Sequence, residues 1–279
     1  MSGSPILALP GPAVHWRYDG DFIIAGQPVV VQQEGGQGRG TGWAVWDGAP
    51  TLAKYLEAAA DDILAGRLPL PAPSSGAASL PPPQSVLELG SGTGLAGLAA
   101  AAALRLPTML TDLAAVLPAL ERHVAANPRL AALVSAAPLD WRHPHASPAL
   151  GGSNSCSSAG SSSGGNGAGC QEAGAAVAHP RAAVAHPRLV LAADCLWLEE
   201  LVGPFVGALA AAASQPGDRA LLAYQSRSTR VDGALFGQLS AAGFDLLPAP
   251  VVPGEPPRGA IDIYWVLRRP QQQQHCSAT

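Results

Sequence analysis

The chain has 279 residues, which is enough for one large domain or two small ones. Apolar residues make up 48% of it, an ordinary share for a protein with a buried core, but charged residues make up only 13%, against roughly 25% in average proteins. With 16 basic and 20 acidic residues, the net charge is −4 and no basic block stands out. This balance argues against broad electrostatic binding of nucleic acid or of an anionic membrane, so we expect neither as a partner.

The sequence also argues against a membrane span, a disulfide framework and a metal site. The longest strongly apolar run, Leu95–Leu104, is shorter than the ~20 residues that a bilayer requires. The N-terminal sequence MSGSPILALPGP has no basic region of the signal-peptide type. The four cysteines, Cys156, Cys170, Cys195 and Cys276, show no CxxC spacing. We therefore expect a monomeric intracellular protein without bound metal, in the cytoplasm or alternatively in the nucleus.

The first part of the chain predicts a β-hairpin followed by a helix. Two short β-branched runs, FIIAG and PVVVQQ, are typical of paired strands. The stretch TLAKYLEAAADDILAGR predicts a helix that Thr51 can cap and Gly66 can end. Residues 69–83 are rich in proline and serine, which predicts a surface loop.

From Ser85 onward, predicted strands and helices alternate. The expected strands are SVLELG, PTMLTD, a weaker one within LAALVSAAPLDW, and then RLVLAAD, DRALLAYQS and AIDIYWVLRR. The helices expected between them are LAGLAAAAALR, LAAVLPALERHVAAN, LEELVGPFVGALAAAA and VDGALFGQLSAAGF. Such alternation is typical of a parallel α/β sheet. Residues 143–187, which contain a Ser/Gly tract and two copies of AAVAHPR, interrupt it and predict a disordered insertion.

We therefore predict one α/β domain over residues 14–270, with a doubly wound, mostly parallel sheet and an N-terminal β-hairpin extension. The glutamine-rich residues 271–279 are expected to form a disordered tail.

The strongest motif is VLELGSGTG, residues 86–94. A strand that ends in a glycine turn lets the backbone approach a ligand closely, and the start of the next helix offers free amides. Residues 92–97 match the dinucleotide fingerprint GxGxxG, and Asp112 ends the second strand, where a carboxylate can bind ribose hydroxyls. Both features fit either NAD or S-adenosylmethionine.

Glu88 favours S-adenosylmethionine. This carboxylate stands two residues before the first glycine and is expected to lie against the turn. There it would oppose a pyrophosphate but would suit a ligand that is cationic at sulfur and carries an amino group. The ExGxGxG pattern therefore favours S-adenosylmethionine, with NAD as the alternative.

Five motifs occur in an order that resembles a known family. They are GTGWAVWDGAPTLAKYLE, VLELGSGTGLAGLAAA, TDL, LDW and LVLAADCLWLEELVGPFVGAL. The sequence resembles the seven-β-strand protein-lysine methyltransferases, in particular the group that modifies heat-shock chaperones, the valosin-containing ATPase and elongation factors. The resemblance implies a seven-stranded Rossmann-like methyltransferase sheet, S-adenosylmethionine as the cofactor, and a lysine-containing protein as substrate, such as a chaperone, an ATPase or a translation factor.

The resemblance also implies roles for individual residues. The two tryptophans would pack around the cofactor, the glycine turn would cradle its amino-acid part, Asp112 would bind its ribose, and Ala193 would lie beside it. With Glu88, the expected cofactor-binding residues are Trp46, Glu88, Gly90, Ser91, Gly92, Asp112, Trp141 and Ala193. From the residues alone, core packing explains either tryptophan equally well, and Trp43 competes with Trp46 for its role.

The DxxY signature of the family falls on residues 194–197, where Trp197 replaces the tyrosine. Ligands bind at the carboxyl ends of parallel strands, where Asp194 is expected, although this aspartate could instead cap the next helix. Trp197 keeps an aromatic wall, which can contact an ammonium group, but it lacks the hydroxyl. Asp194 and Trp197 are thus the expected catalytic residues, and Cys195 is expected to be a small core residue. Arg227 either lines the substrate mouth or is a surface side chain.

The expected reaction is methyl transfer to a lysine amine. This amine must lose its proton first, since its unperturbed pKa is near 10.4. Asp194 would orient it within an aromatic slot formed by Trp197, so positioning is expected to supply most of the acceleration. Three alternatives remain open: a methyltransferase for a small amine, an NAD-dependent oxidoreductase, and a protein-binding module that keeps the fold without catalysis.

Overall fold

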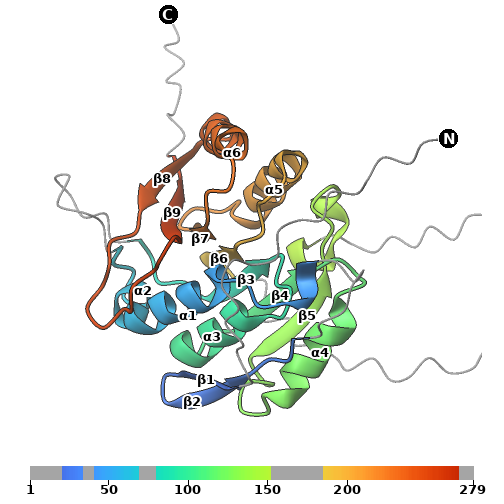
Figure 1. Ribbon diagram of the computed structural model, residues 1–279, viewed down its shortest axis with the longest axis vertical. Coiled ribbons are helices and arrows are strands. Elements are labelled where there is room, and N and C mark those ends of the chain that lie inside the picture. Colours follow the sequence, from blue (N-terminus) through green and yellow to red (C-terminus); the bar gives the residue numbers. More distant parts are fainter. Residues whose placement is uncertain (1–20, 34–40, 69–79, 152–184, 270–279) are drawn as a thin grey trace, which may run out of the picture.

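A seven-stranded sheet forms the centre of the fold, with helices on both faces (Figure 1). The computed structural model describes residues 21–33, 41–68, 80–151 and 185–269. The strand order is β5-β4-β3-β6-β7-β9-β8; β9 runs antiparallel to β7 and β8, and the other pairs are parallel. The strands are β3 (Ser85–Leu89), β4 (Thr108–Asp112), β5 (Val134–Pro138), β6 (Arg188–Ala193), β7 (Arg219–Tyr224), β8 (Phe244–Pro248) and β9 (Asp262–Arg268). This confirms the predicted doubly wound, mostly parallel α/β sheet.

The helices divide between the two faces of the sheet. Alternate strand residues point to opposite faces, so that Val86 of β3 packs with the first group of helices and Leu87 with the second. Burial on both faces explains why the central strands β6 and β7 are nearly continuous apolar runs. The first group is α1 (Gly48–Ala58), α2 (Ala60–Leu64), α3 (Leu95–Leu104) and α4 (Leu117–Ala126), and the second is α5 (Glu199–Ala212) and α6 (Thr229–Ala241).

Helix α3 lies unusually close to the sheet. Nine of its ten residues are buried. At Gly97 an added Cβ would overlap the side chain of Leu110 and lie 2.7 Å from Oε2 of Glu88. A glycine at this position therefore lets the first turn of α3 approach β3 and β4, and fixes that turn at the carboxyl edge of the sheet.

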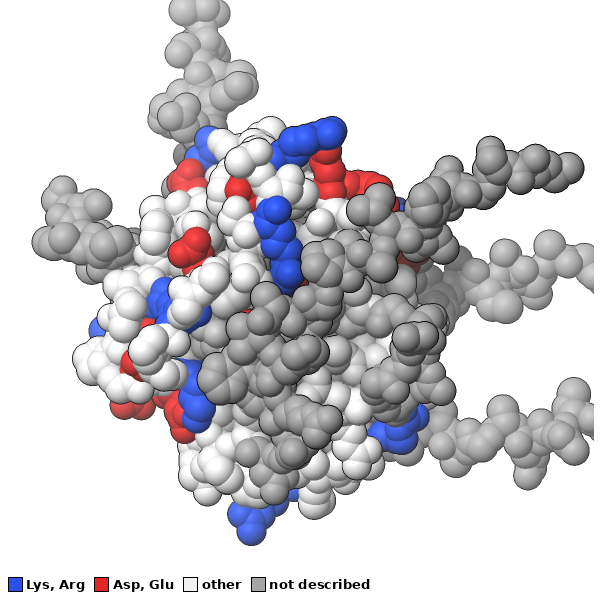
Figure 2. All heavy atoms as spheres, viewed as in Figure 1, with Lys and Arg blue, Asp and Glu red and all other residues white. Residues whose placement is uncertain are grey.

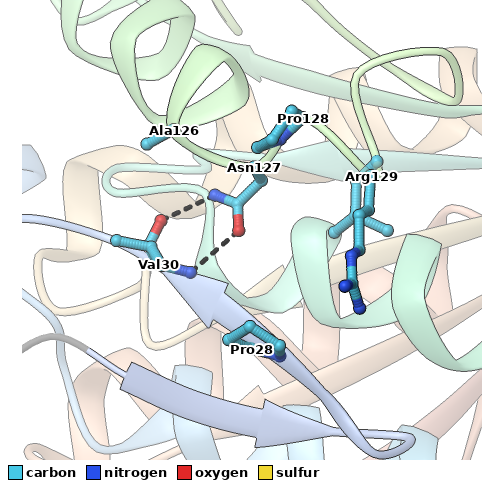
Figure 3. A pocket seen from close by; sticks show the side chains of 7 residues that line it. Pro28, Val30, Ala126, Asn127, Pro128 and Arg129 are labelled. Atoms are coloured by element: carbon cyan, nitrogen blue, oxygen red, sulfur yellow. Dashed lines mark hydrogen bonds between the residues drawn. The ribbon is translucent and has the colours of Figure 1, made fainter.

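The predicted hairpin is present as β1 (Asp21–Ile24) and β2 (Gln27–Val30), which pair in antiparallel register. Asn127, just after α4, holds its second strand: Oδ1 accepts from the Val30 amide at 2.8 Å, and Nδ2 donates to the Val30 carbonyl at 2.7 Å (Figure 3). The Asn127 side chain thus makes with the Val30 backbone the pair of hydrogen bonds that a neighbouring strand would otherwise make. A small surface hollow beside this contact is lined by Pro28, Val30, Ala126, Asn127, Pro128, Arg129 and Leu130.

Element predictions were wrong at the start of the first helix and at one edge of the sheet. Helix α1 begins at Gly48 rather than after Thr51, because Pro50 is tolerated in a first turn; the Thr51 hydroxyl donates to the carbonyl of Asp47 at 2.7 Å inside that turn instead of capping the helix. The edge strand β8 was not predicted, since its sequence, FDLLP, is short and half-exposed.

The predicted insertion at 143–187 is wrong at both of its ends. Residues Pro144–Ala146 and Pro148–Leu150 form 3₁₀ helices, and the Ser147 hydroxyl between them donates to the Pro138 carbonyl at 2.5 Å. At the other end, Nδ1 of His186 lies 2.8 Å from Oδ1 of Asp218. The remainder, 152–184, lies outside the described residues, as do 69–79 of the predicted loop and the predicted tail 271–279. Residues 80–83 contain no helix or strand.

Charged side chains are interspersed on the surface. In Figure 2, lysines and arginines alternate with aspartates and glutamates among many uncharged residues. Within the part of the chain that the structure describes, no helix is long and apolar enough to span a bilayer.

Candidate active site

The glycine turn between β3 and α3 has a conformation that requires glycine. Gly90, Gly92 and Gly94 have φ angles of 66°, 52° and 79°, in the left-handed region that other residues rarely adopt. Ser91 ties the turn to β4: its amide donates to the Thr111 carbonyl, and its Oγ accepts from the Thr111 amide, each at 2.9 Å. The turn is therefore held by the Ser91 side chain and by backbone angles that glycine adopts without strain.

Asp112 ends β4 directly beside this turn. Oδ2 accepts from the Gly92 amide at 2.8 Å, and Oδ1 accepts from the Leu113 amide at 2.7 Å. Burial raises the pKa of Asp112, and the two amides oppose that rise. Each oxygen keeps a further lone pair, so the carboxylate can also accept from the hydroxyls of a ligand.

Glu88 lies deeper than the other acids. Its side chain is buried, and Oε2 accepts from the Gly97 amide in α3 at 3.1 Å. Burial raises its pKa to about 8, while hydrogen bonds from Ser91 and Gly97 oppose the rise. The carboxyl group thus supports the turn and the helix start from within, and its contribution to a cationic ligand stays a prediction.

The segment before α1 covers the turn from outside. Thr41–Trp43 form a 3₁₀ helix, and Trp43 is its last residue. An added Cβ at Gly92 would lie 3.3 Å from the Gly42 carbonyl oxygen, which shows how closely the segment approaches. Trp46 is half-buried, and its indole nitrogen donates to the Thr41 carbonyl at 2.9 Å.

Asp194 follows β6 and adopts a strained backbone conformation, with φ at 53°. Its amide donates to the Ala223 carbonyl at 2.9 Å, and the start of α1 packs so closely that a Cβ on Gly48 would lie 2.8 Å from Asp194 Cβ. The N-cap of α5 is Leu198, so the alternative in which Asp194 caps that helix is wrong. The Asp194 side chain is only 3% exposed.

Arg227 joins these two segments. Its Nη2 donates to both Asp194 oxygens at 3.0 Å, and its Cζ lies 5.3 Å from the ring centroid of Trp46, within cation–π range. Asp47 lies nearby: burial and the charge of Asp194 raise its pKa, and Arg227 lowers it. Of the two readings of Arg227, the structure therefore supports a place in the site.

The remaining predicted residues surround the turn and the end of β6. The Trp141 ring packs edge-on against Phe205, with centroids 5.4 Å apart, and its Cζ2 would lie 2.9 Å from a Cβ on Gly90. Burial, then the charge of Asp194, raises the pKa of Cys195 far above its ordinary value, which agrees with a core thiol rather than a nucleophile. Ala193 ends β6, and Trp197 is half-buried in the loop before α5.

The structure thus places the glycine turn, Asp112 and Asp194 at the carboxyl ends of β3, β4 and β6, where ligands bind in open α/β sheets. Trp141 packs against the turn and Trp46 lies beside Arg227. Sequence reasoning missed Asp47, although it stands within the VWDGA motif, and left Arg227 undecided. Within the described residues, no group of three or more His, Cys, Asp or Glu side chains is placed to hold a metal ion.

Comparison with known proteins bears on this site. The model of a family described as lysine methyltransferase matches residues 25–152, which confirms the resemblance over that part of the chain. The matched part includes the second strand of the hairpin, Trp46, the glycine turn, Asp112 and Trp141. No curated protein matches the chain.

Three solved structures illustrate the similarity of fold. An O-methyltransferase family protein from Burkholderia thailandensis is 13% identical, with a TM-score of 0.41, covering 68% of this chain and 52% of its own. Aeropyrum pernix fibrillarin, with bound S-adenosyl-L-methionine, is 14% identical, with a TM-score of 0.41 and 66% of each chain covered. The magnesium protoporphyrin IX methyltransferase of Synechocystis PCC 6803 is 14% identical, with a TM-score of 0.41, covering 79% of this chain and 81% of its own. This chain spans about half the length of the Burkholderia protein.

The family match over residues 25–152 makes S-adenosylmethionine the cofactor to consider at this site. The residues fit that cofactor. Trp141 packs against Gly90, and the Asp112 carboxylate is fixed beside the turn, where it can accept from ribose hydroxyls.

Proposed function

We propose that the protein transfers a methyl group from S-adenosylmethionine to the side-chain amine of a lysine in a protein substrate. One observation carries the proposal: the buried carboxylate of Asp194 holds a cationic nitrogen beside the indole of Trp46, on the sheet edge that also carries the glycine turn. A carboxylate and an aromatic face that already bind a guanidinium are chemically suited to a lysine amine. The lysine methyltransferase family match supports this acceptor.

The predicted cofactor-binding residues would contact two parts of S-adenosylmethionine, the amino-acid part and the ribose. The backbone of Gly90, Ser91 and Gly92 would bind the amino-acid part, and Asp112 would accept from the ribose hydroxyls. Trp46 and Trp141 would bound the cofactor, with Ala193 leaving room for it and Glu88 supporting the turn beneath. When bound, the cofactor supplies a methyl group on an electrophilic sulfonium.

The acceptor amine would be positioned by Asp194 and Trp197. The nitrogen needs its lone pair, so its proton passes to solvent before attack; the N–C bond then forms as the C–S bond breaks, leaving S-adenosylhomocysteine. Asp194 would accept an N–H of the neutral amine and thereby direct the lone pair. Trp197 would form the wall of the slot and contact the charged methylated product. Such positioning removes much of the entropic barrier to the reaction.

The test combines labelling and cofactor binding. Purified protein, methyl-labelled S-adenosylmethionine and a hypomethylated cell lysate are mixed, with Asp194→Ala and Asp112→Ala in parallel. Asp245→Ala, an exposed acid that pairs with Arg269 at 3.4 Å, is the matched control. We expect label on discrete protein bands with the wild type and the control, and none with Asp194→Ala although it still binds cofactor. Asp112→Ala is expected to weaken cofactor binding about tenfold or more.

The other outcomes separate the alternatives. Label only in small molecules would indicate a small-amine methyltransferase. Cofactor binding without any label would favour a non-catalytic binding module. A melting temperature raised by NAD rather than by S-adenosylmethionine would favour an oxidoreductase. Equal loss of cofactor binding in both Asp variants would contradict the separate roles of Asp112 and Asp194.

A further inference from the structure

We propose that Arg227 sets the charge of the transfer site, so that the site selects the neutral form of the acceptor amine. This inference rests on the proposed function and adds a positioning residue to it. Arg227 would act through Asp194 and through its own charge, without touching the transferred methyl group.

The first argument is the geometry of the contact. A single nitrogen of Arg227 lies 3.0 Å from each Asp194 oxygen, and the guanidinium faces the Trp46 ring. The carboxylate is 3% exposed, whereas the arginine side chain is 34% exposed. Arg227 therefore stands between a buried acid and the solvent from which an amine approaches.

The second argument is the balance of charge around the guanidinium. Asp194 faces it from the end of β6 and Asp47 from the start of α1. Three residues before Arg227, β7 ends at Tyr224, whose hydroxyl donates to Asp232 of α6 at 2.6 Å; burial and Asp232 raise the pKa of Tyr224. Toward the glycine turn, Asp194 lies next to Cys195, on which the charges of Asp112 and Glu88 also act. Arg227 interacts with the acids Asp194, Asp47 and Tyr224, so removing Arg227 would leave them without this cation.

The third argument is the chemistry of the acceptor. An ammonium has no lone pair and cannot accept a methyl group. Next to unpaired carboxylates its protonated form is favoured, and its pKa rises; a nearby guanidinium has the opposite effect. With Arg227 in place, the guanidinium balances the negative charge of Asp194. The carboxylate oxygens still keep free lone pairs that can accept an N–H of the neutral amine. The ion pair of Asp194 with Arg227 thus orients the amine and disfavours the protonated form of that amine.

The experiment is a pH profile of methyl transfer. Initial rates of label incorporation into protein bands of a hypomethylated lysate are measured from about pH 7 to about pH 10, below the unperturbed lysine pKa of about 10.4. The proteins compared are the wild type, Arg227→Gln, Arg227→Lys and, as a matched control, Arg230→Gln, whose arginine is 81% exposed and pairs with Glu199 at 2.8 Å. The dissociation constant of S-adenosylmethionine and the melting temperature are measured for each variant at each pH.

We expect Arg227→Gln to move the midpoint of the rising limb upward by about one pH unit. Arg227→Lys, which restores the charge, and Arg230→Gln should keep the wild-type midpoint. An unchanged midpoint in Arg227→Gln would overturn the inference, as would Arg227→Lys behaving like Arg227→Gln. Loss of label at every pH in Arg227→Gln, with cofactor binding intact, would also overturn it and indicate that Arg227 only holds Asp194 in place.

Failure of the proposed function gives a different result. In that case the wild type itself labels no protein band at any pH while binding S-adenosylmethionine, and the inference about Arg227 fails with it. If the wild type labels bands and all variants share one midpoint, only the inference about Arg227 fails.

Discussion

At the residue scale, Glu88 is an acid whose protonation is linked to folding. Its pKa is raised to about 8 by burial, from an ordinary value of 4.5. Between these two values the folded protein binds more protons than the unfolded chain, so the contribution of Glu88 to stability is present at low pH and is lost as the pH rises toward 8.

We therefore predict that the unfolding free energy of the wild type, relative to Glu88→Gln, falls as the pH rises from the ordinary glutamate pKa to about 8. The slope should reach at most about 1.4 kcal/mol per pH unit. Glutamine keeps the acceptor for the Gly97 amide but does not titrate. Urea denaturation of both proteins across this range measures the difference, in which all other titrating groups cancel. A difference independent of pH would contradict the prediction.

Gly97 is a second residue whose role can be measured. An alanine there would overlap Leu110 and press on Glu88, both in buried positions. Gly97→Ala should destabilise the protein by about 1–3 kcal/mol, because the added methyl forces α3 away from the sheet. The matched control is Gly207→Ala in α5, where nothing lies within 4 Å of an added Cβ; it should stabilise by about 0.5–1 kcal/mol. Thermal unfolding distinguishes the two, and equal effects would exclude close packing as the cause.

The positions of Asp112 and Asp194 could be predicted because each ends an apolar strand, and parallel strands end at one edge of the sheet. The ion pair of Asp194 with Arg227 could not be predicted, since it joins residues 33 positions apart through the register of β6 and β7. Burial of Glu88 could not be predicted either, because it depends on how closely α3 approaches β3.

At the element scale, the hairpin depends on one side chain of another element. Asn127→Ala would leave the amide and the carbonyl of Val30 without their partner, at a cost of about 1–3 kcal/mol. We predict faster hydrogen exchange at the Val30 amide in this variant. Asn127→Asp keeps the acceptor for that amide and should retain more of its protection. Equal protection in the wild type and in Asn127→Ala would show that the contact contributes nothing.

This hairpin is also connected to the site. Three residues after the end of β2, the Gln33 side chain accepts from the amide of Val45 at 3.0 Å, and Val45 immediately precedes Trp46. If the contact positions Trp46, loosening the hairpin by Asn127→Ala should also weaken cofactor binding. Titration of the same variant with S-adenosylmethionine measures this effect.

The elements that sequence patterns located well are the buried ones. Strands β3, β6 and β7 are continuous apolar runs between turn signals, and the structure has them where they were predicted. Strand β8 lies at the edge, half-exposed and without β-branched residues, so its pattern carried little information. The ends of the predicted insertion are ordered because single contacts, such as that of Ser147 with Pro138, hold them in place. Their composition alone is typical of disorder.

At the scale of the whole molecule, the sheet consists of two halves that are each continuous in sequence. Residues 21–151 supply β5, β4 and β3, and residues 185–269 supply β6, β7, β9 and β8, with the boundary between β3 and β6. The site lies at this boundary: the glycine turn and Asp112 come from the first half, whereas Asp194 and Arg227 come from the second.

The two halves should therefore assemble from separate chains. Residues 1–165 and 166–279, expressed together, are predicted to bind S-adenosylmethionine, and neither should bind it alone. The contacts that would hold them are extensive: the β3–β6 ladder, and α1 against the second half, where the Trp265 indole donates to the Tyr55 hydroxyl at 3.2 Å. Calorimetry of the mixture and of each fragment is the measurement. Binding by one fragment alone would show that the site is not shared.

Because both halves contribute to the site, a bound cofactor would contact both and hold them together. In the intact chain, ligand binding adds to the stability of a structure whose halves are already tethered. In a divided chain the same binding free energy would favour association, so the fraction of fragments joined would report the concentration of free S-adenosylmethionine. A chain divided at the boundary between β3 and β6 could thus serve as a sensor for the methyl donor. Fluorophores on the two fragments would supply the signal.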